Sequence, residues 1–270
     1  HGDPIADILA YMIEQRHYID VDVHSGTALC AGKAFARRRQ PARALPMFLL
    51  CQKLGYLSAD GQFDDDGPDA MISFNGFEAP LYFARTILSH HGELRQLVSQ
   101  REGVYQTAME MFTYSLEHCR DEDVAGIAGR HGYEELARKY RWDLALQTGH
   151  AEDVIDEIKT TMHSGDTRDV RSLAAVRLTS HYHRTGAYRQ AAAVAAKLAT
   201  GKVHGRCSTF GLHRLEMTAT ASRDPAVAKL LRATAQEMLD KYADDLSESA
   251  RKRVEKLLSY TPPPTEETSP

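Results

Sequence analysis

The chain has 270 residues, of which 43% are apolar, and its 33 Lys and Arg and 37 Asp and Glu residues give a formal net charge of −4. This composition supports one long or two short globular domains and contains too little Gly and Pro for a low-complexity chain. It excludes a strongly basic protein that binds nucleic acid through its overall charge. The longest apolar runs, 45–51 and 191–196, fall far short of the roughly 18 residues that a membrane-spanning helix needs, so we expect a soluble chain.

Apolar residues recur at intervals of three and four along the chain, and stretches that alternate apolar and polar residues are nearly absent. This periodicity is typical of helices that bury one face, and it predicts an all-α fold. The first helices are expected at 5–13, 28–35 and 41–54. Pro41 suits the first turn of the third helix, Pro46 lies early enough to be tolerated, and Gly55 is expected just past the end.

Residues 58–77 interrupt this periodicity with Gly, Pro and five Asp residues, so they predict an exposed acidic insertion loop. The aspartates do not follow the order of an EF-hand. Gln62 and Ser73 stand where that loop needs its first ligand and its final Glu. No calcium site is therefore expected.

Beyond the loop, the periodicity predicts helices at 78–90, 93–101, 104–118 and 123–129. Three helix pairs follow, at 132–147 with 151–163, at 168–184 with 187–200, and at 207–221 with 225–242. Ser247 is expected to cap a last helix that ends near Tyr260, because its hydroxyl can accept a hydrogen bond from a free amide of the first turn. The polar, Pro-rich residues 261–270 predict a disordered tail.

The helix pairs have a common repeat length. Their turns lie at Gly149, Gly186 and Arg223, at intervals of 37 residues, and the N-terminal hairpin aligns on Tyr18 and Tyr56, 38 residues apart. This spacing is typical of an α-solenoid and predicts about five or six helix hairpins. The alternative is an irregular all-α domain whose hairpins have similar lengths. The expected divisions are N-terminal hairpins at 1–57, the acidic loop at 58–77, a helical-repeat array at 78–260 and the tail at 261–270.

Two segments resemble known helical-repeat families. The ends of the first two hairpins are similar to the end of a pentatricopeptide repeat, although the usual Pro is missing from both and His17 replaces a Gly. The residues concerned are Met12-Ile13-Glu14 with His17-Tyr18, and Cys51-Gln52-Lys53 with Gly55-Tyr56. A later segment resembles a tetratricopeptide repeat through Leu178, Tyr182, Gly186, Tyr188 and Ala191.

The resemblance implies a helical-repeat scaffold and two possible activities. Tetratricopeptide-like arrays usually bind proteins, whereas pentatricopeptide proteins are typically organellar and read single-stranded RNA with polar side chains. In this chain the base-reading position falls on Gly26 or Leu29, and neither side chain can hydrogen-bond to a base. We therefore expect a non-catalytic scaffold subunit that contacts other proteins within a large mitochondrial assembly (respiratory, ATP-synthase or ribosomal).

The mitochondrial location, on the matrix side, follows from the resemblance and from the His at position 1. The alternative function is an organellar RNA-binding protein of the pentatricopeptide type. It would use the basic segment 166–232, which holds 12 basic and 4 acidic residues.

Arginines supply the candidate partner-binding residues. A first group lies at the turn expected before the third helix. These arginines could pair with an acidic partner, or they could simply be solvated residues at a helix end. A second group lies in the basic segment, where phosphates, an acidic protein face or water are all possible partners. The candidates are Arg37, Arg38, Arg39, Arg43, Arg168, Arg171, Arg177, Arg184, Arg189, Arg206 and Arg214.

No pattern of catalytic or metal-binding residues stands out, so we expect no enzyme, no cofactor, no metal and no small-molecule substrate. The chain has no P-loop and no GxSxG motif. His181 and His183 are two residues apart on a helix and so point to different faces. The four widely spaced cysteines are interpreted as small buried side chains in a reducing compartment, and Trp142 is expected in the core rather than at an interface.

Overall fold

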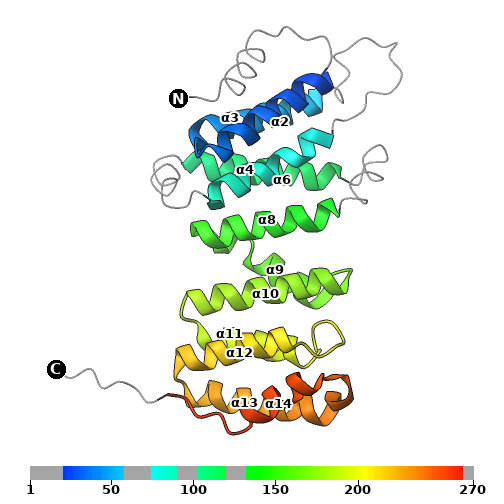
Figure 1. Cartoon of the computed structure of the whole chain (residues 1–270). Coiled ribbons are helices and arrows are strands. Elements are labelled where there is room, and N and C mark those ends of the chain that lie inside the picture. Colours follow the sequence, from blue (N-terminus) through cyan, green and yellow to red (C-terminus); the bar gives the residue numbers. More distant parts are fainter. Residues whose placement is uncertain (1–20, 58–73, 90–101, 120–131, 264–270) are drawn as a thin grey trace, which may run out of the picture. The chain divides into compact units, whose positions relative to one another are not determined.

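The computed structural model describes residues 21–57, 74–89, 102–119 and 132–263 (Figure 1). Every regular element within these ranges is a helix, which confirms the all-α prediction. The chain divides into two compact units, residues 1–149 and 150–270. Among the described helices, none is long and apolar enough to cross a membrane.

The first unit contains α2 (Val21–Arg37), α3 (Pro41–Leu57), α4 (Phe74–Ser89), α6 (Glu102–His118) and α8 (Tyr133–Thr148). Helix α2 packs on α3 and α4, α3 packs on α4, and α4, α6 and α8 contact one another (Figure 1). Large aromatic side chains fill the spaces between these helices. The fully buried ones include Phe35, Phe48, Phe77, Phe112 and Trp142, which confirms the core position expected for the tryptophan.

Helices α2 and α3 approach each other closely at Gly32. A Cβ atom at this position would lie 2.5 Å from the ring carbon Cε1 of Phe48, so only a glycine leaves room for the ring. On another side, the Phe48 ring stacks on Tyr82 of α4, with ring centroids 5.9 Å apart and an interplanar angle of 22°. Gly32 thus allows one buried ring to join three helices.

The described residues of the second unit, 150–263, form two short 3-10 turns and six α-helices. Along the chain these are η1 (Ala151–Asp153), α9 (Ile155–Ser164), α10 (Arg168–Arg184), α11 (Tyr188–Ala199), α12 (Thr209–Ser222), α13 (Pro225–Tyr242), η2 (Ala243–Asp245) and α14 (Glu248–Leu257). Each of these α-helices packs on the next, and α11 also packs on α13 (Figure 1). The expected cap is confirmed, because the Ser247 hydroxyl accepts a hydrogen bond from the Ala250 amide at 3.3 Å.

The spacing found in the sequence recurs in the backbone. Gly149, Gly186 and Arg223, at intervals of 37 residues, all adopt left-handed conformations, with φ angles of 95°, 75° and 52°. In the turn between α10 and α11 and in the turn between α12 and α13, the chain therefore reverses at a residue with a left-handed backbone conformation.

Contacts between successive hairpins of the second unit also share a register. Three side-chain contacts each join residues 35 positions apart: His183 with Thr218, Arg189 with Asp224, and Lys202 with Glu237. Three side-chain contacts between the α10–α11 and α12–α13 hairpins thus share one offset, whereas the hydrogen bond from the Tyr242 hydroxyl to the Thr200 carbonyl oxygen spans 42 residues.

Two predicted helix boundaries are wrong. Helix α4 begins at Phe74, so the last four residues of the predicted 58–77 loop are helical. Burial explains this, because Phe77 is fully buried and packs edge-on against Tyr133 at 5.6 Å. Gly55 lies inside α3 rather than after it, since a glycine costs a helix only about 1 kcal/mol and does not by itself end one.

Two further expectations need correction. The predicted helix at 151–163 begins as a 3-10 turn, and its α-helical part starts only at Ile155. The cysteines were expected to be buried, and Cys51 and Cys119 are, but Cys30 is exposed and Cys207 is half-buried. Cys30 points away from the face of α2 that buries Ala28, Ala31 and Phe35.

Several predictions fall on residues outside the described ranges. These are the helices at 5–13, 93–101 and 123–129, most of the 58–77 loop, and residues 264–270 of the tail. The tail residues 261–263 have no regular secondary structure.

Substituting Gly211 should test the close packing of the second unit. A Cβ atom there would lie 2.6 Å from the Ala199 amide nitrogen, and backbone atoms cannot yield as a side chain can. We expect Gly211→Ala to lower the free energy of unfolding by about 1–3 kcal/mol in urea denaturation. Gly103→Ala is the control, because its Cβ would meet nothing within 4 Å. An equal loss in both variants would contradict the packing argument.

Candidate partner-binding site

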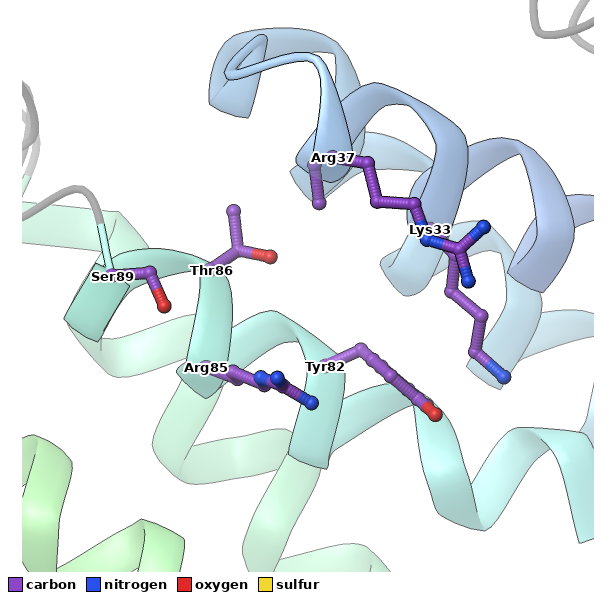
Figure 2. Close-up of a pocket in the computed structure, with 7 residues that line it drawn as sticks. Lys33, Arg37, Tyr82, Arg85, Thr86 and Ser89 are labelled. Carbon is purple, nitrogen blue, oxygen red and sulfur yellow. The ribbon is translucent and has the colours of Figure 1, made fainter.

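A pocket of about 390 Å³ lies between α2 and α4 of the first unit (Figure 2). Helix α2 contributes two cations and a methyl group, and α4 contributes a third cation and three hydroxyl groups. The lining residues are Lys33, Ala36, Arg37, Tyr82, Arg85, Thr86 and Ser89. No carboxylate is among them, so the pocket favours an anion.

Lys33 is held in place at one side of this pocket. Its Nζ lies 3.3 Å from Glu78 Oε2 and 4.2 Å from the centroid of the Tyr82 ring. Burial opposes the charge on this amine, but the interactions with Tyr82 and Glu78 outweigh it, so the pKa of Lys33 lies above its ordinary value. The amine therefore stays protonated at neutral pH, with much of its charge balanced by Glu78.

Arg37 and Arg85 differ from Lys33 in having exposed guanidinium groups. Within the described part of the chain, neither side chain makes a hydrogen bond or an ion pair. Figure 2 shows Arg37 extending from α2 and Arg85 from α4, on the two sides of the pocket. A guanidinium can form two parallel hydrogen bonds to a carboxylate or a phosphate, so this pair is suited to bind one anion from two directions.

The four arginines expected at the turn between α2 and α3 have different surroundings. Only Arg37 lines the pocket. The Arg43 guanidinium lies over the Phe35 ring, 4.1 Å from its centroid, and donates to Gln40 at 3.4 Å. Arg38 and Arg39 are exposed at the turn itself, where Arg39 has a φ of 57°.

Sequence reasoning missed two of the three cations in this pocket. Lys33 lies one helical turn before Arg37, so the spacing of four residues could have indicated a shared face. Arg85 carries no comparable signal, because it lies on another helix and only the packing of α4 on α2 brings it near.

In the second unit, Arg171 stabilises its own fold. This half-buried side chain donates through Nε to the Val203 carbonyl oxygen at 3.0 Å and through a terminal nitrogen to the Gly165 oxygen at 2.7 Å. It joins the segment before α10 to the segment after α11. Its role as a partner contact remains a prediction, but its hydrogen-bonding groups already serve the fold.

Other cations of the basic segment are also engaged within the unit. Arg189 pairs with Asp224 at 2.7 Å, and Lys202 pairs with Glu237 at 3.0 Å. Hydrogen bonding to Arg189 and to the Ala226 amide lowers the pKa of Asp224. These contacts neutralise part of the excess charge that the sequence places in 166–232.

The remaining candidate arginines of the second unit differ in exposure. Arg168, Arg184 and Arg206 are exposed, and Arg177 is half-buried. Burial, together with the charges of Arg168 and Arg171, lowers the pKa of His204.

An exposed apolar strip runs along α12. Phe210 and Met217, two turns apart, are the exposed large hydrophobic side chains of the described residues, at 45% and 42% exposure. Arg214 lies between them, with its guanidinium 5.2 Å from the Phe210 ring centroid. Aromatic, Met and Arg side chains are the types enriched in protein interfaces, and Arg214 is one of the candidates selected from the sequence, whereas Phe210 and Met217 are not.

Arg171 and Arg189 offer a direct test of which arginines support the fold. We expect Arg171→Ala to lower the free energy of unfolding by about 1.5–3 kcal/mol, because two partly buried carbonyl oxygens lose a charged donor. Arg189→Ala should have a much smaller effect, since its side chain is 78% exposed. Urea denaturation measures both, and a larger loss for Arg189→Ala would contradict this assignment.

The cysteines give a second prediction. Burial raises the pKa of the Cys51 thiol to about 12, whereas Cys30 is exposed. Because the thiolate is the reactive form, iodoacetamide at pH 8 should alkylate Cys30 in the folded protein and reach Cys51 only after unfolding. Mass spectrometry of timed reactions measures this, and equal rates at the two residues would contradict the burial.

Within the described ranges, no three His, Cys, Asp or Glu side chains gather as a metal site would require. No family model matches the chain, and neither a curated protein nor a solved structure does. The resemblance to pentatricopeptide and tetratricopeptide repeats therefore depends on the residues quoted above, and the structure adds all-helical, sequentially packed units.

Proposed function

We propose that the chain is a non-catalytic helical-repeat scaffold of the solenoid type, which binds other protein subunits within a large mitochondrial assembly. The observation that carries this proposal is the common register of the hairpins in the second unit. Three side-chain contacts between the α10–α11 and α12–α13 hairpins share an offset of 35 residues, and a shared offset is what a repeat produces when each hairpin packs on the next.

Helical-repeat arrays have a large exposed surface on which partners can bind. Each hairpin buries one face on its neighbours and leaves another face on the surface, so the array offers far more exposed surface for its length than a round domain does. The α12 strip of Phe210, Arg214 and Met217 is such a face in the second unit. The pocket between α2 and α4 is a second surface, in the first unit.

The contacts of the basic segment favour a protein partner over RNA. An RNA-binding surface needs free cations that follow the phosphate backbone. In this segment Arg171, Arg189 and Lys202 already bind groups of their own unit. We therefore propose a protein partner, and the filter-binding assay described below tests whether residues 168–232 bind RNA instead.

The location is supported by the pentatricopeptide resemblance. Respiratory, ATP-synthase and ribosomal assemblies are the candidates that this resemblance suggests. Identification of the co-purified subunits would decide among the three.

The proposal predicts that the tagged chain, purified from nuclease-treated mitochondria, will be recovered with fixed amounts of other subunits. We expect Phe210→Ser combined with Met217→Ser to reduce this recovery, because these are the exposed large hydrophobic side chains of the described residues. Lys229→Ser, an exposed substitution on α13, is the matched control. Recovery of the wild-type chain as a free monomer would contradict the proposal.

A filter-binding assay addresses the RNA alternative. The proposal predicts no retention of poly-U or total mitochondrial RNA at low salt. Retention that falls steeply between about 50 and 300 mM salt would instead support RNA binding through the basic segment.

A further inference from the structure

We propose that the pocket between α2 and α4 binds a phosphate monoester dianion, held between the guanidinium groups of Arg37 and Arg85. The site lies within the first unit and does not depend on the scaffold function proposed above. The charge of the pocket, its dimensions and hydroxyl groups, and the rigidity of the surrounding side chains favour this ligand.

The positive charges that line the pocket favour a ligand with two negative charges. Lys33 is paired with Glu78 at 3.3 Å, so its charge is largely satisfied within the protein. The charges of Arg37 and Arg85 are not balanced by any ion pair in the described residues. A phosphate monoester carries a charge of about −1.5 to −2 at neutral pH and matches two guanidinium groups. A single carboxylate or an RNA phosphodiester carries only one negative charge and would leave one arginine unmatched.

The pocket has room and hydrogen-bond donors for such a group. Its volume of about 390 Å³ exceeds that of a phosphate alone and also admits the small organic group that carries it. Ser89, which is exposed, brings a hydroxyl group to the α4 side (Figure 2). The three oxygens of a bound phosphate monoester can accept hydrogen bonds from guanidinium and hydroxyl groups together.

The walls of the pocket are fixed before any ligand binds. Tyr82 is stacked on the buried Phe48 ring, and the Lys33 amine lies over Tyr82 while it pairs with Glu78. Both arginines project from helices rather than from loops. On binding, chiefly the two arginine side chains lose conformational freedom, so the entropic cost of binding is low.

Isothermal titration of the full-length chain with inorganic phosphate and with O-phosphoserine tests the proposal. Acetate at the same ionic strength is the singly charged comparison. We expect both dianions to bind and acetate to bind at least about tenfold more weakly, because it satisfies only one arginine. Acetate binding as tight as that of phosphate, or no dianion binding up to about 10 mM, near the weak end of measurable affinity, would overturn the proposal.

Variants locate the binding in the pocket. Arg85→Gln and Arg37→Gln should each weaken phosphate binding by about tenfold or more, since each removes a charge-assisted hydrogen-bond donor. Arg39→Asn is the matched control. It removes a nearby positive charge outside the pocket, and Asn tolerates the φ of 57° at that position. Thermal melting checks that each variant folds, and an equal loss in Arg39→Asn would overturn the site in favour of diffuse charge attraction.

The same titration separates the two sources of the phosphate group. A short phosphoserine peptide that binds more tightly than O-phosphoserine, with no binding of its unphosphorylated form, would support the site and indicate a phosphorylated partner protein. Equal affinity for the peptide and the free amino acid would support the site and indicate a small phosphorylated molecule.

Discussion

The close approach of successive helices is the constraint on which the rest of the structure depends. Each helix can bury its apolar face only against its neighbours, so the helix axes must come near enough to exclude water. Gly32 meets this need in the first unit by leaving space for the Phe48 ring, and Gly211 meets it in the second by lying against the Ala199 backbone. Phe48 then fixes Tyr82, and Tyr82 supports Lys33, so the same packing that forms the core also shapes the pocket.

Local signals were sufficient to predict most of the helices. The periodicity and caps place the boundaries of α10 and α13 at the observed residues, and Ser247 caps α14 as expected. The errors at Gly55 and at the start of α4 have a different origin. In the case of α4, burial of Phe77 against another helix extends the element beyond its local signal, and no local pattern contains that contact.

The candidate site was less predictable than the fold, because a sequence gives the charge of a side chain but not its direction. Arg37 was selected from the sequence, yet its neighbour in the pocket, Arg85, lies on a different helix and was not. Arg171 and Arg189 were both candidate partner-binding residues in the sequence. In the structure, Arg171 donates to two backbone carbonyl oxygens, whereas Arg189 pairs with Asp224 at the surface. The two pocket arginines differ from both in being paired with neither a carbonyl nor a carboxylate of the described chain.

Native-state hydrogen exchange of the full-length chain, read by mass spectrometry, tests the central claim that each unit is held together by close packing between neighbouring helices. The comparison needs the wild type, Gly32→Ala and Gly211→Ala. The packing described predicts that Gly32→Ala lowers amide protection in α2 to α4 and leaves α11 and α12 unchanged, with the reverse for Gly211→Ala. A uniform loss of protection through both units in either variant would contradict it.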